Sequence, residues 1–138
     1  MPPRVDHIGV LVPDLESAVA KFCRLLEGLP PVRRDLPEVG LRIAEFQTEN
    51  LNIELIAYDG PAEFARRVMG NDIGINHLTI QVENVGDAVA KLTDAGLRVQ
   101  EGFPRPGAHG MVAFFQRDDT TGLLLEVCAP DAVAKDHD

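Results

Sequence analysis

The sequence is poor in cysteine and in basic side chains, and each shortage excludes a class of protein. Its only cysteines are Cys23 and Cys128, which form no CxxC pair, so neither a disulfide scaffold nor a zinc knuckle is expected. There are 13 Lys and Arg against 22 Asp and Glu, a formal net charge of −9. This balance argues against a general binder of nucleic acid or anionic membranes, because phosphate contacts need clustered Lys and Arg. An anionic substrate in a local basic pocket is still compatible with it.

Long apolar runs are also missing. No stretch reaches the roughly 18 residues of a membrane span, and the first residues lack the apolar core of a signal peptide. The default expectation is a cytoplasmic, reduced protein. The 138 residues, 45% hydrophobic and 25% charged, predict a single globular domain over 1–138.

What the sequence does contain is an internal repeat. The segment VDHIGVLVPDLESAVAK at 5–21 is matched by INHLTIQVENVGDAVAK at 75–91, which aligns His7 with His77. A second pair, IELIA at 53–57 and LEVCA at 125–129, aligns Glu54 with Glu126. Each half therefore carries one histidine early and one glutamate late, and such a repeat is a strong guide to architecture.

Alternating apolar residues and helix-capping signals predict the same order of elements in both halves. In the first half a helix begins after Asp14 and ends at Gly28, and in the second a helix begins after Asn84 and ends at Gly96. The apolar stripe of the first helix is expected to include Leu25. Strands are expected at 4–12, near 33–35, and at 41–47, 51–58, 75–82, 97–101, 111–116 and 123–129, with an irregular loop at 102–110.

The order is βαβββ followed by βαβββ, an α+β fold of two tandem modules that pair their curved sheets around a metal-containing cleft. We expect module 1 at about 4–60, a linker at 61–74, module 2 at about 75–129 and a tail at 130–138. A pseudo-two-fold axis between the modules would direct the paired histidines and glutamates toward a common centre.

Two imidazoles and two carboxylates suit a divalent ion such as Co, Ni, Mn or Zn. The alternative is that His7 and His77 are ordinary strand histidines. A glutamate flanked by apolar residues inside a strand is costly to bury without a partner, however, and here this occurs twice in matching register. The residues therefore predict a metal site made of His7, Glu54, His77 and Glu126.

The same residues resemble a known family. The motifs VDHIGV at 5–10, PDL at 13–15, NHL at 76–78 and LE at 125–126 are similar to the vicinal oxygen chelate superfamily (the glyoxalase, bleomycin resistance and dioxygenase proteins) over 4–129. Within it, GLRIA at 40–44 and GAHG at 107–110 most resemble methylmalonyl-CoA epimerases. The resemblance implies a paired βαβββ fold, usually a homodimer, whose four metal ligands map onto His7, Glu54, His77 and Glu126.

The epimerase resemblance also implies a reaction. A divalent metal bound to the thioester carbonyl of an acyl-CoA stabilises the enolate formed when a base removes the α-proton, and reprotonation from the opposite face inverts the centre. Glu126 and Glu45 are the candidate bases. Some epimerases carry a glutamate where this chain has Ile43, which leaves the proton-transfer groups open.

Three further residues are candidates for substrate binding. His109 and Gly110 belong to a loop that borders the cleft in the family, although His109 could equally be exposed. Epimerases usually read FLHPK after the penultimate strand, where this chain reads FQRDD at 115–119. Arg117 there could hold a CoA phosphate, and the alternative is a solvated hairpin turn.

Three other functions compete. Glyoxalase I uses the same ligand set, but the bacterial forms usually have an Arg where this chain has Leu11 and an Asn where it has Tyr58. Extradiol dioxygenases bind Fe(II) through two His and one carboxylate, and Glu54 would occupy a position that they keep open. Small members that only bind or sequester a molecule often lose ligands, so four retained ligands favour an enzyme. We expect a metal-dependent isomerase acting on a 2-substituted acyl-CoA, with a glyoxalase I-type lyase or a non-catalytic small-molecule-binding protein as the alternatives.

Overall fold

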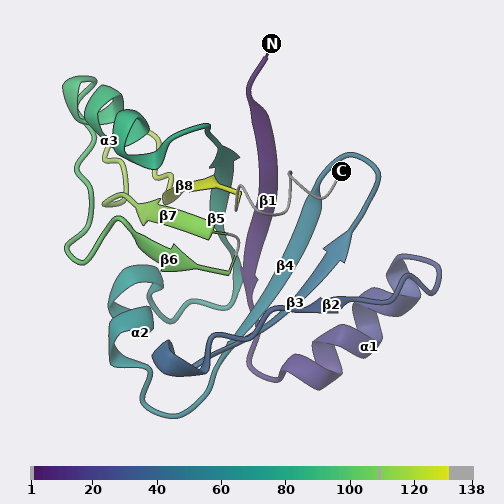
Figure 1. Ribbon diagram of the computed structural model, residues 1–138. Coiled ribbons are helices and arrows are strands. Elements are labelled where there is room, and N and C mark those ends of the chain that lie inside the picture. Colours follow the sequence, from purple (N-terminus) through teal and green to yellow (C-terminus); the bar gives the residue numbers. More distant parts are fainter. Residues whose placement is uncertain (1, 109, 131–138) are drawn as a thin grey trace. The chain divides into compact units, whose positions relative to one another are not determined.

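The computed structural model describes residues 2–108 and 110–130, which fall into two compact units. One unit comprises 7–77, and the other combines the residues before 7 with those from 78 onward. Two strands contribute to both units, namely β1 (Arg4–Leu11) and β5 (Gly74–Gln81) (Figure 1).

The unit at 7–77 contains the first predicted module. After β1 it has α1 (Leu15–Leu25), β2 (Val32–Arg33), a 3₁₀ turn (Pro37–Val39), β3 (Leu41–Gln47), β4 (Asn52–Tyr58) and α2 (Glu63–Met69). Its strands are hydrogen-bonded in the order β2-β3-β4-β1, with β3 and β4 antiparallel and β4 and β1 parallel. This register sets Glu54 opposite Gly9 on one side and opposite Glu45 on the other.

The other unit repeats the arrangement. After β5 come α3 (Val85–Asp94), β6 (Arg105–Gly107), β7 (Gly110–Phe114) and β8 (Leu125–Ala129), in the order β5-β8-β7-β6. Strands β5 and β8 are parallel, and their register sets Thr79 opposite Glu126. Both halves therefore have the predicted βαβββ order, and the α+β class of tandem modules is confirmed.

The first long helix of each unit begins at the predicted cap. The carboxylate of Asp14 accepts from the backbone N–H of Ser17 at 3.2 Å, and Asn84 accepts from Asp87 at 2.9 Å. Each helix packs its apolar face on the sheet of its own unit. The buried residues of the two cores are Leu15, Ala44, Phe46, Leu55 and Ala57 in the first unit, and Val85, Ala113, Phe115, Leu125 and Val127 in the second.

Leu25 is a correction to the predicted stripe of α1. It lies at the edge of the apolar face and is 66% exposed, whereas Cys23, on the opposite edge, packs against the core.

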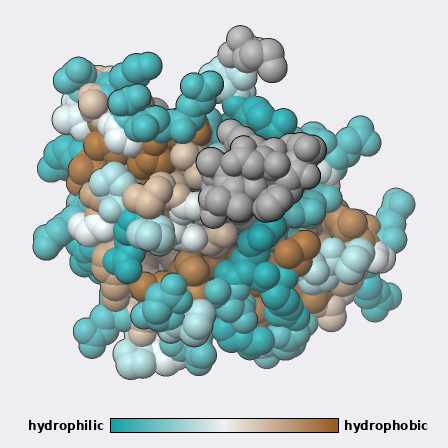
Figure 2. All heavy atoms as spheres, in the orientation of Figure 1, coloured by the Kyte–Doolittle hydropathy of each residue, from teal (hydrophilic) through white to brown (hydrophobic). Residues whose placement is uncertain are grey.

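On the face of the molecule seen in Figure 2, hydrophilic residues predominate and apolar ones lie between them.

The prediction of a strand at 97–101 is wrong. Only Val99 there makes a bridge, to Phe115, and the second strand of the module is β6, inside the segment predicted to be an irregular loop. A proline at position 106 removes one N–H donor, but β6 is the last strand in the order, and an edge strand tolerates a missing donor.

The predicted linker contains α2, and the domain boundaries stay a prediction. Residues 131–138 of the predicted tail lie outside the described residues. Among the helices in 2–108 and 110–130, none has the length and apolar character required to cross a membrane.

Candidate metal centre

The site begins on the buried face of β1. Alternation places His7, Gly9 and Leu11 on one side of this strand, and all three are buried. Nε2 of His7 lies 3.6 Å from Oε2 of Glu54 on β4, and both side chains are almost wholly buried. The rings of His7 and His77 meet edge to face, with their centroids 5.8 Å apart and their planes at 80°. Three of the predicted ligands therefore lie together within residues 7–77.

The ring of His77 lies directly over the backbone of β1. A Cβ atom built on Gly9 would stand 2.2 Å from Cε1 and 2.4 Å from Nε2 of His77, far inside van der Waals contact. Only glycine at position 9 leaves room for the imidazole, and this requirement is steric rather than conformational. The sequence pattern had not identified Gly9 as a site residue.

A hydrogen-bonded chain holds the other side of the His77 ring. Nδ1 of His77 lies 2.8 Å from Oδ1 of Asn76, and Nδ2 of Asn76 donates to the carbonyl oxygen of Met69, also at 2.8 Å. Met69 is the last residue of α2, so Asn76 links the end of that helix to the imidazole.

Glu126 is held by its neighbour in the parallel register. The hydroxyl of Thr79 donates to Oε1 of Glu126 at 2.6 Å, and both residues are buried. Thr79 takes in the second repeat the place that Gly9 takes in the first, so the two halves support their glutamates differently.

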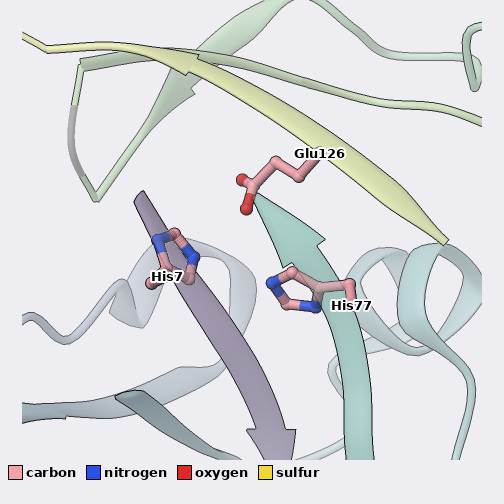
Figure 3. Close-up of side chains that lie close together, drawn as sticks. All are labelled: His7, His77 and Glu126. Atoms are coloured by element: carbon pink, nitrogen blue, oxygen red, sulfur yellow. The ribbon is translucent and has the colours of Figure 1, made fainter. Parts of the chain in front are cut away.

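His7, His77 and Glu126 form a group that can hold a divalent metal ion. One ligand atom of each lies within 4.8 Å of those of the other two, and all three residues are buried (Figure 3). Two imidazole nitrogens and a carboxylate suit transition-metal ions, and a cation would offset the cost of burying the carboxylate. Of the predicted ligands, Glu54 is outside this group and lies beside His7.

Glu45, predicted as a catalytic carboxylate, is completely buried. Its Oε1 accepts from Nε of Arg34 and from Nε2 of Gln47, each at 3.1 Å. Because Glu45 lies directly opposite Glu54 in the antiparallel pair, the two side chains share one face of the sheet. Sequence reasoning missed Arg34 and Gln47, although the i, i+2 spacing of Gln47 and Glu45 places those two on one face.

The structure describes two of the three predicted substrate-binding residues, Gly110 and Arg117. Arg117 is exposed, and its Nη1 donates to the carbonyl of Gly122 at 2.7 Å, which closes the turn before β8. Asp118 accepts from Thr120 and Thr121 in the same turn. Gly110 begins β7 with a φ of +97°. His109 lies outside the described residues.

Comparison with known proteins gives consistent relatives. Residues 6–115 match the family model of the glyoxalase/bleomycin resistance protein/dioxygenase superfamily. The chain is 34% identical over 128 residues to an ethylmalonyl-CoA/methylmalonyl-CoA epimerase of Cereibacter sphaeroides, covering 90% of this chain and 96% of that protein. It is 32% identical over 129 residues to the mitochondrial methylmalonyl-CoA epimerase of Bos taurus, covering 90% of this chain and 73% of that one.

A solved structure supports the same relationship. A methylmalonyl-CoA epimerase in complex with methylmalonyl-CoA and NH4+ superimposes with a TM-score of 0.75 at 26% identity, covering 96% of this chain and 98% of that one. The resemblance inferred from the sequence motifs is therefore confirmed, and the chain is similar to isomerases of this type.

Proposed function

Because the chain belongs to the glyoxalase/bleomycin resistance/dioxygenase superfamily, we propose that it is a metal-dependent epimerase of a 2-substituted acyl-CoA such as methylmalonyl-CoA. The observation that carries the proposal is the buried group of His7, His77 and Glu126 in a chain whose relatives are named as epimerases of such thioesters.

The metal would be held by His7, His77 and Glu126, with Glu54 as the fourth ligand. A bound divalent ion (Co, Ni, Mn or Zn) supplies a Lewis acid that stabilises negative charge on a carbonyl oxygen as the α-proton leaves. The protein keeps the ligand atoms in a buried place, where charge interactions are stronger than in water.

We assign the removal of the C2 proton to Glu45. This carboxylate shares a sheet face with Glu54, and Arg34 and Gln47 hold it in one orientation. A base must lie within reach of the proton and keep its geometry, and a carboxylate held by hydrogen bonds from Arg34, Gln47 and Asn52 meets the second condition.

Inversion at C2 needs a second proton carrier on the opposite face. Glu126 is the remaining predicted candidate. Its hydrogen bond from Thr79 favours a fixed position, so its role as a metal ligand is better supported than its role as a base.

Binding of the acyl-CoA is assigned to His109, Gly110 and Arg117. The charge of Arg117 fits a CoA phosphate, although its guanidinium also closes its own turn. A homodimer and a cytoplasmic location complete the proposal.

The test is a comparison of two substrates with one protein. The metal-stripped chain is reloaded with Co²⁺ and given a single stereoisomer of methylmalonyl-CoA, or the hemithioacetal of methylglyoxal and glutathione. We expect Co²⁺-dependent epimerisation of the first and no turnover of the second. Turnover of the hemithioacetal alone would instead make the protein a glyoxalase I-like lyase. Stoichiometric metal binding without either reaction would leave only a small-molecule-binding protein.

A further inference from the structure

Asn76 makes two hydrogen bonds, and the chemistry of the partner atoms determines which side-chain atom of Asn76 makes each bond. The carbonyl oxygen of Met69 can only accept, so the side-chain atom of Asn76 that lies 2.8 Å from it is the NH₂ group. The amide oxygen of Asn76 is therefore the atom that faces Nδ1 of His77 at 2.8 Å. Asn76 is only 9% exposed, so water does not readily replace either partner.

The second bond determines which nitrogen of His77 carries the proton. An amide oxygen accepts and does not donate, so Nδ1 of His77 must bring the hydrogen. In the neutral ring the lone pair then lies on Nε2, and a metal needs a nitrogen lone pair. His77 is thus in the tautomer that offers Nε2 to the metal before any metal is bound.

We propose that Asn76 is a positioning residue that presets His77 as a metal ligand by fixing its tautomer and ring orientation from the end of α2. The inference rests on the proposed metal site, since it concerns how one of its ligands is prepared. The Met69 carbonyl is essential to it, because it prevents the Asn76 amide from turning its NH₂ group toward the imidazole.

Comparison with the first half of the repeat shows what an amide provides at position 76. The corresponding residue of the first half is Asp6, and a carboxylate at position 76 could accept from Nδ1–H but could not donate to Met69. Only a side chain with one donor and one acceptor at this length satisfies both the helix end and the imidazole. Asparagine meets that requirement.

The tautomer can be measured without metal or substrate. We would label the full-length, metal-stripped chain with ¹⁵N-histidine, record long-range ¹H–¹⁵N correlations at about pH 8, and assign His77 from a His77→Gln variant. The wild type is expected to show a pyrrole-type Nδ1 and a pyridine-type Nε2. In Asn76→Leu, which has the same branching and number of side-chain heavy atoms but no polar atoms, the Nε2–H tautomer should become populated.

Metal affinity gives the second readout. Loss of a residue that hydrogen-bonds to a metal-ligating histidine typically weakens metal binding by about 10- to 100-fold. We expect a loss in this range for Asn76→Leu in a Co²⁺ titration. Asn76→Asp should keep the tautomer and most of the affinity even if the fold is weakened, because it retains an acceptor. Asn50→Ala, in an exposed loop, is the control and should change neither readout.

A pyrrole-type Nε2 in the wild type would overturn the proposal. So would an Asn76→Leu variant that keeps both the tautomer and the affinity for Co²⁺, or an Asn76→Asp variant that loses both. These results do not depend on turnover. If they come out as expected while methylmalonyl-CoA is not epimerised, the proposed function fails and the role of Asn76 remains.

Discussion

Gly9 is the residue on which the place of the His77 ring depends most directly. In Gly9→Ala the new methyl group would stand 2.2 Å from Cε1 of His77, so the ring or the strand must move. We expect a loss of stability of about 1–3 kcal/mol and a clear fall in metal affinity, measured by urea unfolding and by Co²⁺ titration.

The matched control for this change is Gly86→Ala. Gly86 lies in α3, where an added Cβ would approach only the side chain of Asn84, at 3.2 Å. This variant should bind Co²⁺ as the wild type does. If Gly9→Ala also bound Co²⁺ with unchanged affinity, His77 would not be a ligand in the position described.

Glu45 is the residue on which the proposed proton transfer depends. Glu45→Gln keeps the size of the side chain and removes its basicity, so the epimerisation rate should fall by about 10²- to 10⁴-fold. Metal affinity should stay the same, because Glu45 is not one of the three grouped ligand residues. Full epimerase activity in this variant, measured with Co²⁺ present, would exclude Glu45 as the base.

At the scale of elements, Glu16 on α1 forms ion pairs with arginines on two strands of its own unit. Its carboxylate accepts from Nη2 of Arg33 on β2 at 2.8 Å and from Nη2 of Arg42 on β3 at 2.7 Å. Hydrogen bonds from these two guanidinium groups hold the pKa of Glu16 below its usual value of 4.5. A lowered pKa means that the charged form is favoured by folding, so its contribution is present above pH 4.5 and is lost as the pH falls through the folded value.

The Glu16→Gln variant should therefore be less stable than the wild type at pH 7, and the difference should shrink as the pH is lowered below 4.5. The effect should be small and should weaken in high salt, because the groups are exposed. Urea midpoints at several pH values measure it, and Glu49→Gln on the loop between β3 and β4 is the control. A difference that stayed constant with pH would mean that the Glu16 ion pairs do not contribute.

Local signals predicted most of the elements. The caps at Asp14 and Asn84 and the hairpin around 48–50 depend on residues close together in sequence, and the repeat identified the same order in both halves. Strand β6 was not predictable in this way. Its residues, two of which are Pro106 and Gly107, form a strand because β7 offers an edge to pair with, which is a tertiary effect.

The same distinction applies to the site. The repeat alone identified His7, Glu54, His77 and Glu126, because matching positions in two modules are visible in the sequence. The partners that support them were not visible. Arg34 reaches Glu45 only because β2 and β3 pair in one register, and Asn76 reaches Met69 only because the chain between them brings the start of β5 to the end of α2.

At the scale of the whole molecule, metal binding and folding should be linked. An ion that binds only the folded chain stabilises it by RT ln(1 + [M]/Kd), about 2.7 kcal/mol at one hundred times Kd. We expect the melting temperature to rise with Co²⁺ concentration and the rise to be lost in Glu126→Gln. Lowering the pH should also abolish it, since protonated histidines release the metal. A wild-type melting temperature that does not change with Co²⁺ concentration would argue against a metal site.

The most direct measurement is hydrogen exchange at C2 of methylmalonyl-CoA in D₂O, with metal-stripped protein that has been reloaded with Co²⁺. The account predicts that deuterium enters C2 only when metal is present and that incorporation is lost in Glu126→Gln. Incorporation that does not require metal, or none at all with Co²⁺ bound stoichiometrically, would contradict metal-dependent removal of the C2 proton.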